Sequence, residues 1–106
     1  MNNQTYTLPR DSYMVARLFD QVLDNAKGRF VGFENVTNKG VRRWSIASRA
    51  PRAAVAALTG KARAPDPAHV RRVYDAGKKA WRTVDLSTAR ALWYSANGVT
   101  MRYEFF

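Results

Sequence analysis

Apolar residues repeat with a helical period close to the start of the chain. Ser12 can cap the first turn of such a helix, and Gly28 follows the last apolar position, where helices commonly end. The pattern predicts an amphipathic helix over residues 12–27 that packs on a sheet, and it leaves the polar residues 1–8 as a loose N-terminus. The apolar stripe consists of Met14, Val15, Leu18, Phe19, Val22, Leu23 and Ala26.

From residue 29 the alternation changes to a period of two, which is typical of strands with one buried face. Residues 37–40 read Thr-Asn-Lys-Gly, and they can form a tight turn with the glycine at positive φ. The segment 29–48 is therefore predicted to be a β-hairpin. The apolar residues that share a face are Val31 and Phe33 in its first strand and Trp44 and Ile46 in its second.

Residues 49–69 interrupt the strand pattern with alanine, proline and cations. Pro51 is suited to the first turn of a helix, Ala53–Leu58 can continue it, and Gly60 can end it. This segment is predicted to be a basic connection that contains a short helix. Helices of this length are marginal in water, so it is expected to order against the domain or a partner. A neutral insertion is the alternative interpretation.

The remaining residues, 70–106, return to short strands separated by turns. Asn97-Gly98 is a strong signal for a two-residue hairpin turn. With about five short strands, one long helix and one short helix, the 106 residues are predicted to form a single α+β domain built on a small antiparallel β-barrel. The expected strands are Arg71–Asp75, Ala80–Asp85, Ala91–Ala96 and Val99–Phe106, with a tight bend at Leu86–Arg90.

Charge is concentrated in the middle of the chain. The formal net charge is +10, and residues 27–82 hold 14 of the 18 Lys and Arg but only three acidic residues. This asymmetry indicates a polyanionic partner. Thirteen of the cations are arginine, whose planar fork suits phosphate oxygens and base edges. A GC-rich coding sequence would also raise the arginine content, so the bias has a second explanation.

The residue inventory offers little for catalysis. The chain has no cysteine, its one histidine, His69, is expected in an exposed loop, and Asp20 and Asp24 are expected on the solvated face of the helix. No glycine-rich phosphate loop, nucleophile motif or metal-ligand cluster is present. We therefore expect no enzyme activity, no cofactor and no metal. Without a signal-peptide pattern or an apolar run of about 20 residues, a cytoplasmic protein with no membrane partner is expected.

The stretch from Val73 to Leu86 contains a recognisable set of strand and turn residues: Val73, Tyr74, Asp75, Trp81, Arg82, Thr83, Val84, Asp85 and Leu86. This set resembles the small SH3-like β-barrel proteins of bacteriophages and plasmids. The similarity covers about residues 29–94, and the helix at 12–27 and the strand at 99–106 lie outside it. It implies an SH3-like antiparallel barrel, a tight link at Asp85–Thr88 and a phage-like setting in a host cell.

Cations and aromatic residues lie close together along the same part of the chain, which is typical of a nucleic-acid-binding surface. We predict binding of the DNA or RNA backbone with little sequence specificity, in a regulatory or host-takeover role. The tryptophans, Trp44, Trp81 and Trp93, can instead fill the core. The predicted site consists of Arg42, Arg43, Arg71, Arg72, Tyr74, Lys78, Lys79, Trp81 and Arg82.

Two other roles remain open. A protein-interaction module could use the same basic surface to inhibit or adapt an acidic host enzyme, because complementary charge also steers protein association. A structural role in a virion or nucleoprotein is the third. The apolar stripe of the helix and the edge of the last strand leave a homodimer open.

Overall fold

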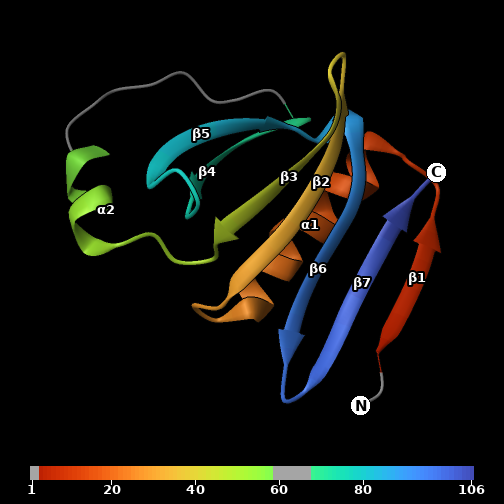
Figure 1. Cartoon of the computed structure of the whole chain (residues 1–106), viewed down its shortest axis with the longest axis horizontal. Helices are drawn as coiled ribbons and strands as arrows, with labels where there is room; N and C mark the ends of the chain where they lie inside the picture. The colour runs from red at the N-terminus through yellow and green to blue at the C-terminus, as the bar shows by residue number, and fades with distance from the viewer. Residues whose placement is uncertain (1–2, 59–67) are drawn as a thin grey trace.

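One mixed sheet and one long helix dominate the computed structural model, which describes residues 3–58 and 68–106 (Figure 1). The strands of this part of the chain are β1 (Gln4–Leu8), β2 (Phe30–Thr37), β3 (Gly40–Ala47), β4 (Val70–Asp75), β5 (Ala80–Asp85), β6 (Ala89–Ala96) and β7 (Val99–Phe105). The helices are α1 (Ser12–Ala26), α2 (Arg52–Leu58) and the short 3-10 helix Leu86–Thr88.

The sheet is open, and the expectation of a closed antiparallel barrel of about five strands is wrong. Its seven described strands follow the order β1-β7-β6-β2-β3-β4-β5, so β1 and β5 are the two edges. Between β3 and β4 just two residue pairs match, Ile46 with Asp75 and Ala47 with Tyr74. The β4–β5 hairpin therefore leaves the sheet beside β3 and does not return to close it, as Figure 1 shows.

Residues 4–8 form a strand, which corrects the expectation of a loose segment at 1–8 for this part of it, and residues 1–2 lie outside the described residues. β1 pairs in parallel with β7, from Gln4 with Met101 to Leu8 with Phe105. Beyond the ladder, the Phe106 amide donates to the Leu8 carbonyl at 3.0 Å, and the Arg10 amide donates to the Phe106 carbonyl at 2.8 Å. An edge strand needs no apolar run of its own, and threonine and tyrosine favour strands.

The predicted amphipathic helix is confirmed, although a neighbouring residue caps it. The Asp11 side chain accepts from the amides of Tyr13 and Met14 at 3.0 Å each, so Asp11 takes the role that we expected of Ser12. At the other end Lys27 adopts the left-handed conformation with φ 48°, and Gly28 follows at φ 93°. None of the described helices is long and apolar enough to cross a membrane.

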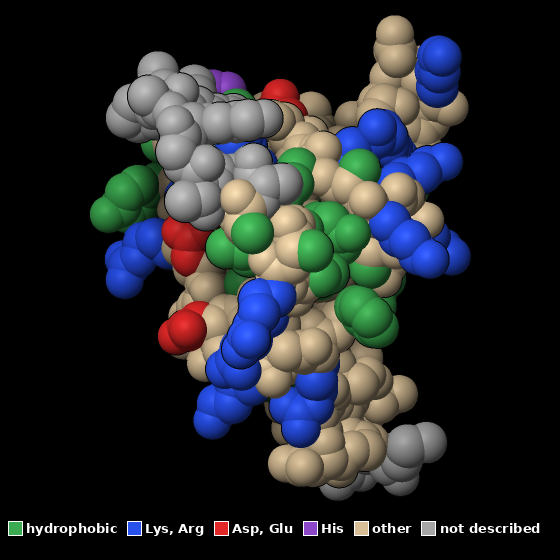
Figure 2. Space-filling view, turned by 90° about the vertical axis from the view of Figure 1, so that its left-hand side faces the viewer, with side chains coloured by type: hydrophobic (Ala, Val, Ile, Leu, Met, Phe, Trp, Pro, Cys, Tyr) green, Lys and Arg blue, Asp and Glu red, His purple; other side chains and the backbone are tan. Residues whose placement is uncertain are grey.

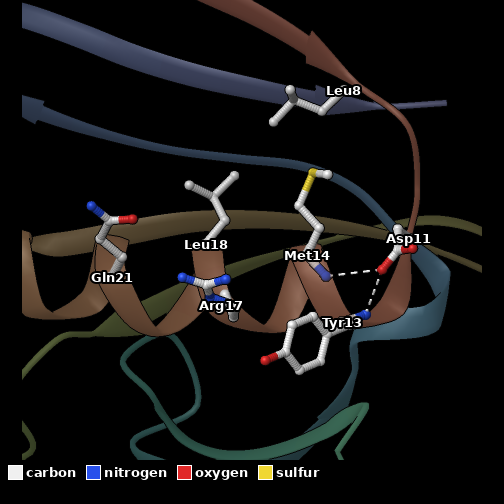
Figure 3. A pocket seen from close by; sticks show the side chains of 7 residues that line it. All are labelled: Leu8, Asp11, Tyr13, Met14, Arg17, Leu18 and Gln21. Atoms are coloured by element: carbon white, nitrogen blue, oxygen red, sulfur yellow. Dashed lines mark hydrogen bonds between the residues drawn. The ribbon is translucent and has the colours of Figure 1, made fainter.

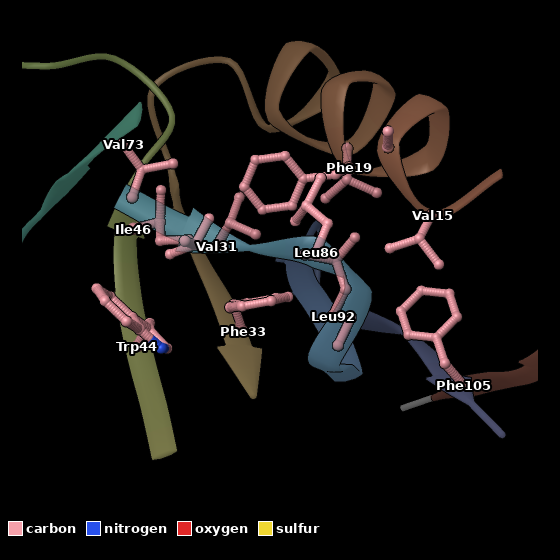
Figure 4. Close-up of a cluster of buried hydrophobic side chains, with 14 of the residues drawn as sticks. Val15, Phe19, Val31, Phe33, Trp44, Ile46, Val73, Leu86, Leu92 and Phe105 are labelled. Carbon is pink, nitrogen blue, oxygen red and sulfur yellow. The ribbon is translucent and has the colours of Figure 1, made fainter. Parts of the chain in front are cut away.

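The core lies between α1 and one face of the sheet (Figure 4). Phe19 of α1 meets Phe33 of β2 edge to face, with ring centroids 5.8 Å apart. Trp44 is buried, as its alternation with Ile46 predicts. In the last strand Phe105 is buried and Tyr103 packs against the core. The largest fully buried side chains are Phe19, Phe33, Ile46, Leu86, Leu92, Val15, Val22, Val31 and Val84.

Local turn chemistry follows the sequence closely. β2 and β3 form the predicted hairpin, with Gly40 at φ 107°. Asn97 and Gly98 both have positive φ, 54° and 77°, in the turn between β6 and β7. The tight link after β5 is the 3-10 helix, and the Asp85 carboxylate accepts from the Ser87 amide at 2.9 Å.

Candidate nucleic-acid interface

A basic groove opens between β3 and the β4–β5 turn. Its volume is about 390 Å³. In Figure 2, Lys and Arg side chains gather below the projecting tip of the β2–β3 hairpin, and a second group lies on the lower half of the same face. The groove therefore combines concave shape with cationic side chains. It is lined by Arg42, Arg43, Trp44, Ser45, Asp75, Gly77 and Lys78.

Asp75 is the acid in this lining, and its carboxylate is already used. It is 5% exposed, and one oxygen accepts from the amides of Gly77 and Lys78 at 3.0 and 3.2 Å. The other oxygen lies 3.9 Å from Nε of Arg82. The carboxylate thus fixes the β4–β5 turn and is compensated inside the protein. The groove is therefore positively charged, and its charge comes from Arg42, Arg43 and Lys78.

Arg42 is held as a flat group over Trp44. Its guanidinium carbon lies 4.0 Å from the centroid of the indole ring. The indole is fixed in turn, because Nε1 of Trp44 donates to Oδ1 of Asn35 at 2.9 Å, and Nδ2 of Asn35 donates to Oγ1 of Thr88 at 3.3 Å. Trp44 is therefore a core residue that positions a cation, and it presents no free ring to a base.

Arg43 lies on the opposite face of β3 from Arg42 and remains open to solvent. Nε of Arg43 donates to Oε1 of the buried Glu34 at 3.0 Å, while 79% of the arginine side chain is exposed. Glu34 also lies 3.8 Å from Arg102 of β7, so two arginines share one carboxylate. The terminal nitrogens of Arg43 have the exposure that a phosphate contact needs.

The predicted site residues separate into groups once the chain folds. Arg71 points to α1, where its Nε and NH2 donate to the two carboxylate oxygens of Asp20 at 2.9 and 3.1 Å. This fork ties β4 to the helix, so Asp20 is engaged by Arg71 and is more than the solvated residue that we expected. The structure brings together Arg42, Arg43 and Lys78 in the groove, and it places Arg82 beside Asp75.

The other predicted residues lie across the β4–β5 turn from the groove. Tyr74 and Trp81 meet edge to face, with centroids 5.6 Å apart. Nε1 of Trp81 donates to the Ala54 carbonyl at 3.0 Å, which attaches β5 to α2. Arg72 lines a small cavity with these two rings, and Lys79 lines a neighbouring pocket that also contains Tyr74. The single predicted patch is thus two surfaces divided by a turn.

One aromatic–cation pair outside the predicted set lies on the sheet face that α1 leaves uncovered. Trp93 covers Gly32, and the guanidinium carbon of Arg102 lies 4.8 Å from its ring centroid. Arg102 also binds Glu104 at 3.1 Å. Alternation along the two strands could have indicated this pair from the sequence, because Trp93 and Arg102 are cross-strand partners in the β6–β7 hairpin. Because carboxylates compensate this arginine, the pair adds little net charge to the surface.

A second groove separates α1 from β1 (Figure 3). Leu8 of β1 faces Met14 and Leu18 of α1 across it, and Tyr13 is 69% exposed at one end. Nearby, Tyr6 stacks on Tyr103 with centroids 5.5 Å apart. Burial, with smaller contributions from Tyr94 and Tyr6, raises the pKa of Tyr103 above its ordinary value of 10.0. This groove is apolar where the first is cationic.

The fold and the groove define a small basic α+β protein built on an open mixed sheet. No protein-family model matches the chain, and no curated protein or solved structure shows significant similarity to it. Within residues 3–58 and 68–106, no cluster of three or more His, Asp or Glu side chains is placed to hold a metal ion.

Proposed function

We propose that the protein binds the backbone of DNA or RNA with little sequence specificity. The observation that carries this proposal is the groove that Arg42, Arg43 and Lys78 line, in which the carboxylate of Asp75 is already bound by the protein. Phosphates would enter the groove and meet the exposed side chains of Arg42 and Lys78 and the exposed terminal nitrogens of Arg43, whose Nε is held by Glu34. Contacts of this kind position a nucleic acid without reading its bases.

Three further features support backbone binding over base reading. The groove is open, and its cations come from two separate segments, β3 and the β4–β5 turn. Arg42 is kept flat by Trp44, so a phosphate contact costs little side-chain ordering. The excess of Lys and Arg in residues 27–82 would attract a polyanion over a longer range. In a phage-like setting within a host cytoplasm, such a protein would act in regulation or host takeover.

The test measures binding of labelled single-stranded and duplex DNA by fluorescence anisotropy at about 50 and 200 mM salt. The variant Arg42→Gln/Arg43→Gln/Lys78→Gln removes the three groove charges. We expect its affinity to fall roughly tenfold or more at the lower salt, and its dependence on salt to weaken by about two to three counterions. The matched control is Arg10→Gln/Arg17→Gln/Arg90→Gln, which removes the same charge from exposed positions elsewhere.

Equal weakening in the two triple variants would show that total charge matters and the groove does not. Absence of wild-type binding to either probe at about 50 mM salt would contradict nucleic-acid binding as a whole. RNA of the same length, measured in parallel, distinguishes the two nucleic acids.

The second candidate function is a protein-interaction module that inhibits or adapts an acidic host enzyme. The apolar groove between α1 and β1, with Tyr13 and Met14 exposed beside it, is the observation that favours this role. A pulldown from nuclease-treated host lysate separates the candidates. A protein that is still captured after nuclease treatment, and is not captured by the triple variant of the basic groove, would favour a protein partner over nucleic acid.

A further inference from the structure

A second pocket, on the other side of the β4–β5 turn, has an unusual arrangement of aromatic side chains. Phe30 of β2 is paired with Ala47 of β3, and Ala47 is paired with Tyr74 of β4. Cross-strand partners point to the same face of a sheet, so a small residue lies between two aromatic ones. The resulting pocket has a volume of about 410 Å³ and is lined by Gly28, Phe30, Ala47, Arg49, Pro51, Tyr74, Ala76 and Lys79.

The spacing of the row admits a flat ring. Neighbouring strands lie about 4.8 Å apart, so Phe30 and Tyr74, two strands apart, begin roughly 10 Å from each other. Stacked rings have centroids about 4.5 to 7 Å apart, and two such distances in succession require roughly 9 Å or more. With alanine as the floor, the gap between Phe30 and Tyr74 is therefore a slot for one planar group.

The two walls differ in how firmly they are held. Tyr74 is partly buried, and Trp81 contacts it edge to face while hydrogen-bonding to α2. Phe30 is 65% exposed, directly after the turn that ends α1. Because most of the Phe30 side chain is exposed, its ring surface is accessible to a ligand.

Among the described residues, cations border the slot and no acid does. Arg49 and Lys79 belong to its lining, and none of the described lining residues is an aspartate or glutamate. Lys79 has φ 54°, a left-handed backbone that the turn imposes. The two consecutive lysines therefore lie in different pockets: Lys78 lines the basic groove, and Lys79 lines the slot. One polyanionic chain could contact both by crossing the turn.

We propose that this slot takes an unstacked base of a single-stranded nucleic acid, with Arg49 and Lys79 on the flanking phosphates. The inference rests on the proposed function and narrows it to single strands, because a base inside a duplex cannot enter the slot. Base stacking on aromatic side chains tolerates any sequence, which agrees with backbone binding in the groove.

The test compares labelled oligo(dT) of about 15 nucleotides with a duplex of equal length, by anisotropy at about 50 mM salt. Two variants remove the slot in opposite ways: Phe30→Ala deletes the exposed wall, and Ala47→Leu fills the floor. Phe106→Ala is the matched control, because Phe106 is 70% exposed and outside the pocket. Thermal unfolding followed by circular dichroism confirms that each variant is folded.

Both slot variants should bind oligo(dT) roughly 5- to 100-fold more weakly than the wild type, with duplex affinity changed less than about twofold. The Phe106→Ala control should bind both probes normally. If oligo(dT) affinity is unchanged in Phe30→Ala and Ala47→Leu while the groove triple variant still weakens both probes, the slot inference is wrong and the proposed function stands. If the wild type binds neither probe, both are wrong.

Two competitors distinguish a base from other ligands. Polyglutamate that displaces oligo(dT) with the same dependence on Phe30 would overturn the assignment in favour of an acidic protein segment. Thymidine monophosphate that binds as tightly as oligo(dT) would overturn it in favour of a free nucleotide. Failure of both to compete supports the single-stranded ligand.

Discussion

Gly32 and Trp93 form a cross-strand pair on the sheet face that α1 leaves uncovered. A Cβ added to Gly32 would lie 2.0 Å from Cε2 of Trp93, far inside contact distance. The indole therefore lies against the backbone of β2, where a glycine is required for space and not for backbone conformation. Arg102 then packs over the same ring at 4.8 Å.

Gly32→Ala is expected to destabilise the protein by about 1–3 kcal/mol, because the indole must move and lose its contacts. Urea unfolding measures the loss. The control is a double-mutant cycle with Trp93→Ala, in which the methyl group meets no ring and Gly32→Ala should cost about 1 kcal/mol less. Additive effects in the cycle would contradict this packing.

Single residues show where sequence reasoning succeeds and where it stops. Alternation placed Trp44 and Ile46 on the buried face, and both are buried. No pattern indicated that Arg71 would bind Asp20, because 51 residues separate them and the pair depends on how β4 lies against α1. The predicted site therefore contained the groove cations together with arginines that hold the fold.

At the scale of elements, local sequence signals identified the helix and each hairpin. The sequence contained no signal for the contacts between distant segments. Caps, turn glycines and alternation act over a few residues, and they locate α1 and the β2–β3 hairpin to within one residue at each end. Strand order depends on contacts between distant segments. The limited pairing of β3 with β4, two residue pairs, leaves the sheet open where a barrel was expected.

A hydrogen bond from the sheet helps to hold the short helix α2. Seven residues are too few for a stable isolated helix, and Trp81 donates to the Ala54 carbonyl at 3.0 Å. The predicted helix at 53–58 is thus confirmed from Arg52 to Leu58, whereas its expected end at Gly60 lies outside the described residues.

Trp81→Phe keeps an aromatic ring and removes the donor. Amide hydrogen exchange over residues 52–58 should become faster, because α2 loses its attachment, while global stability should fall by about 1 kcal/mol. Hydrogen-exchange mass spectrometry measures the exchange of residues 52–58 and that of the rest of the protein. Trp93→Phe serves as the control and should leave exchange in α2 unchanged; equal exchange in the wild type and Trp81→Phe would show that α2 is held by other contacts.

For the whole molecule, β1 decides which edge of the sheet meets solvent. The last strand was expected to offer a free edge for a homodimer, but β7 lies between β6 and β1. β1 is largely exposed and polar, a composition that discourages pairing between copies. The backbone edge of β7 is accordingly covered by β1.

Deletion of residues 1–8 should expose the edge of β7. Because the whole parallel ladder is lost, the free energy of unfolding should fall by at most several kcal/mol. We expect the shortened protein to associate as its concentration rises, which analytical ultracentrifugation would detect. The triple variant of groove charges is the control and should remain monodisperse like the wild type. A stable, monomeric deletion variant would contradict this role for β1.

The parallel pairing of β1 with β7 also has a consequence during synthesis on the ribosome. Residues 4–8 can find their partner only after residues 101–105 have emerged, so β1 has no neighbour while the residues between the two strands are synthesised. A hydrophobic strand left unpaired for that time would invite aggregation. The Thr-Tyr-Thr sequence of β1 tolerates water, so the nascent chain can keep this segment exposed until β7 is available to pair with it.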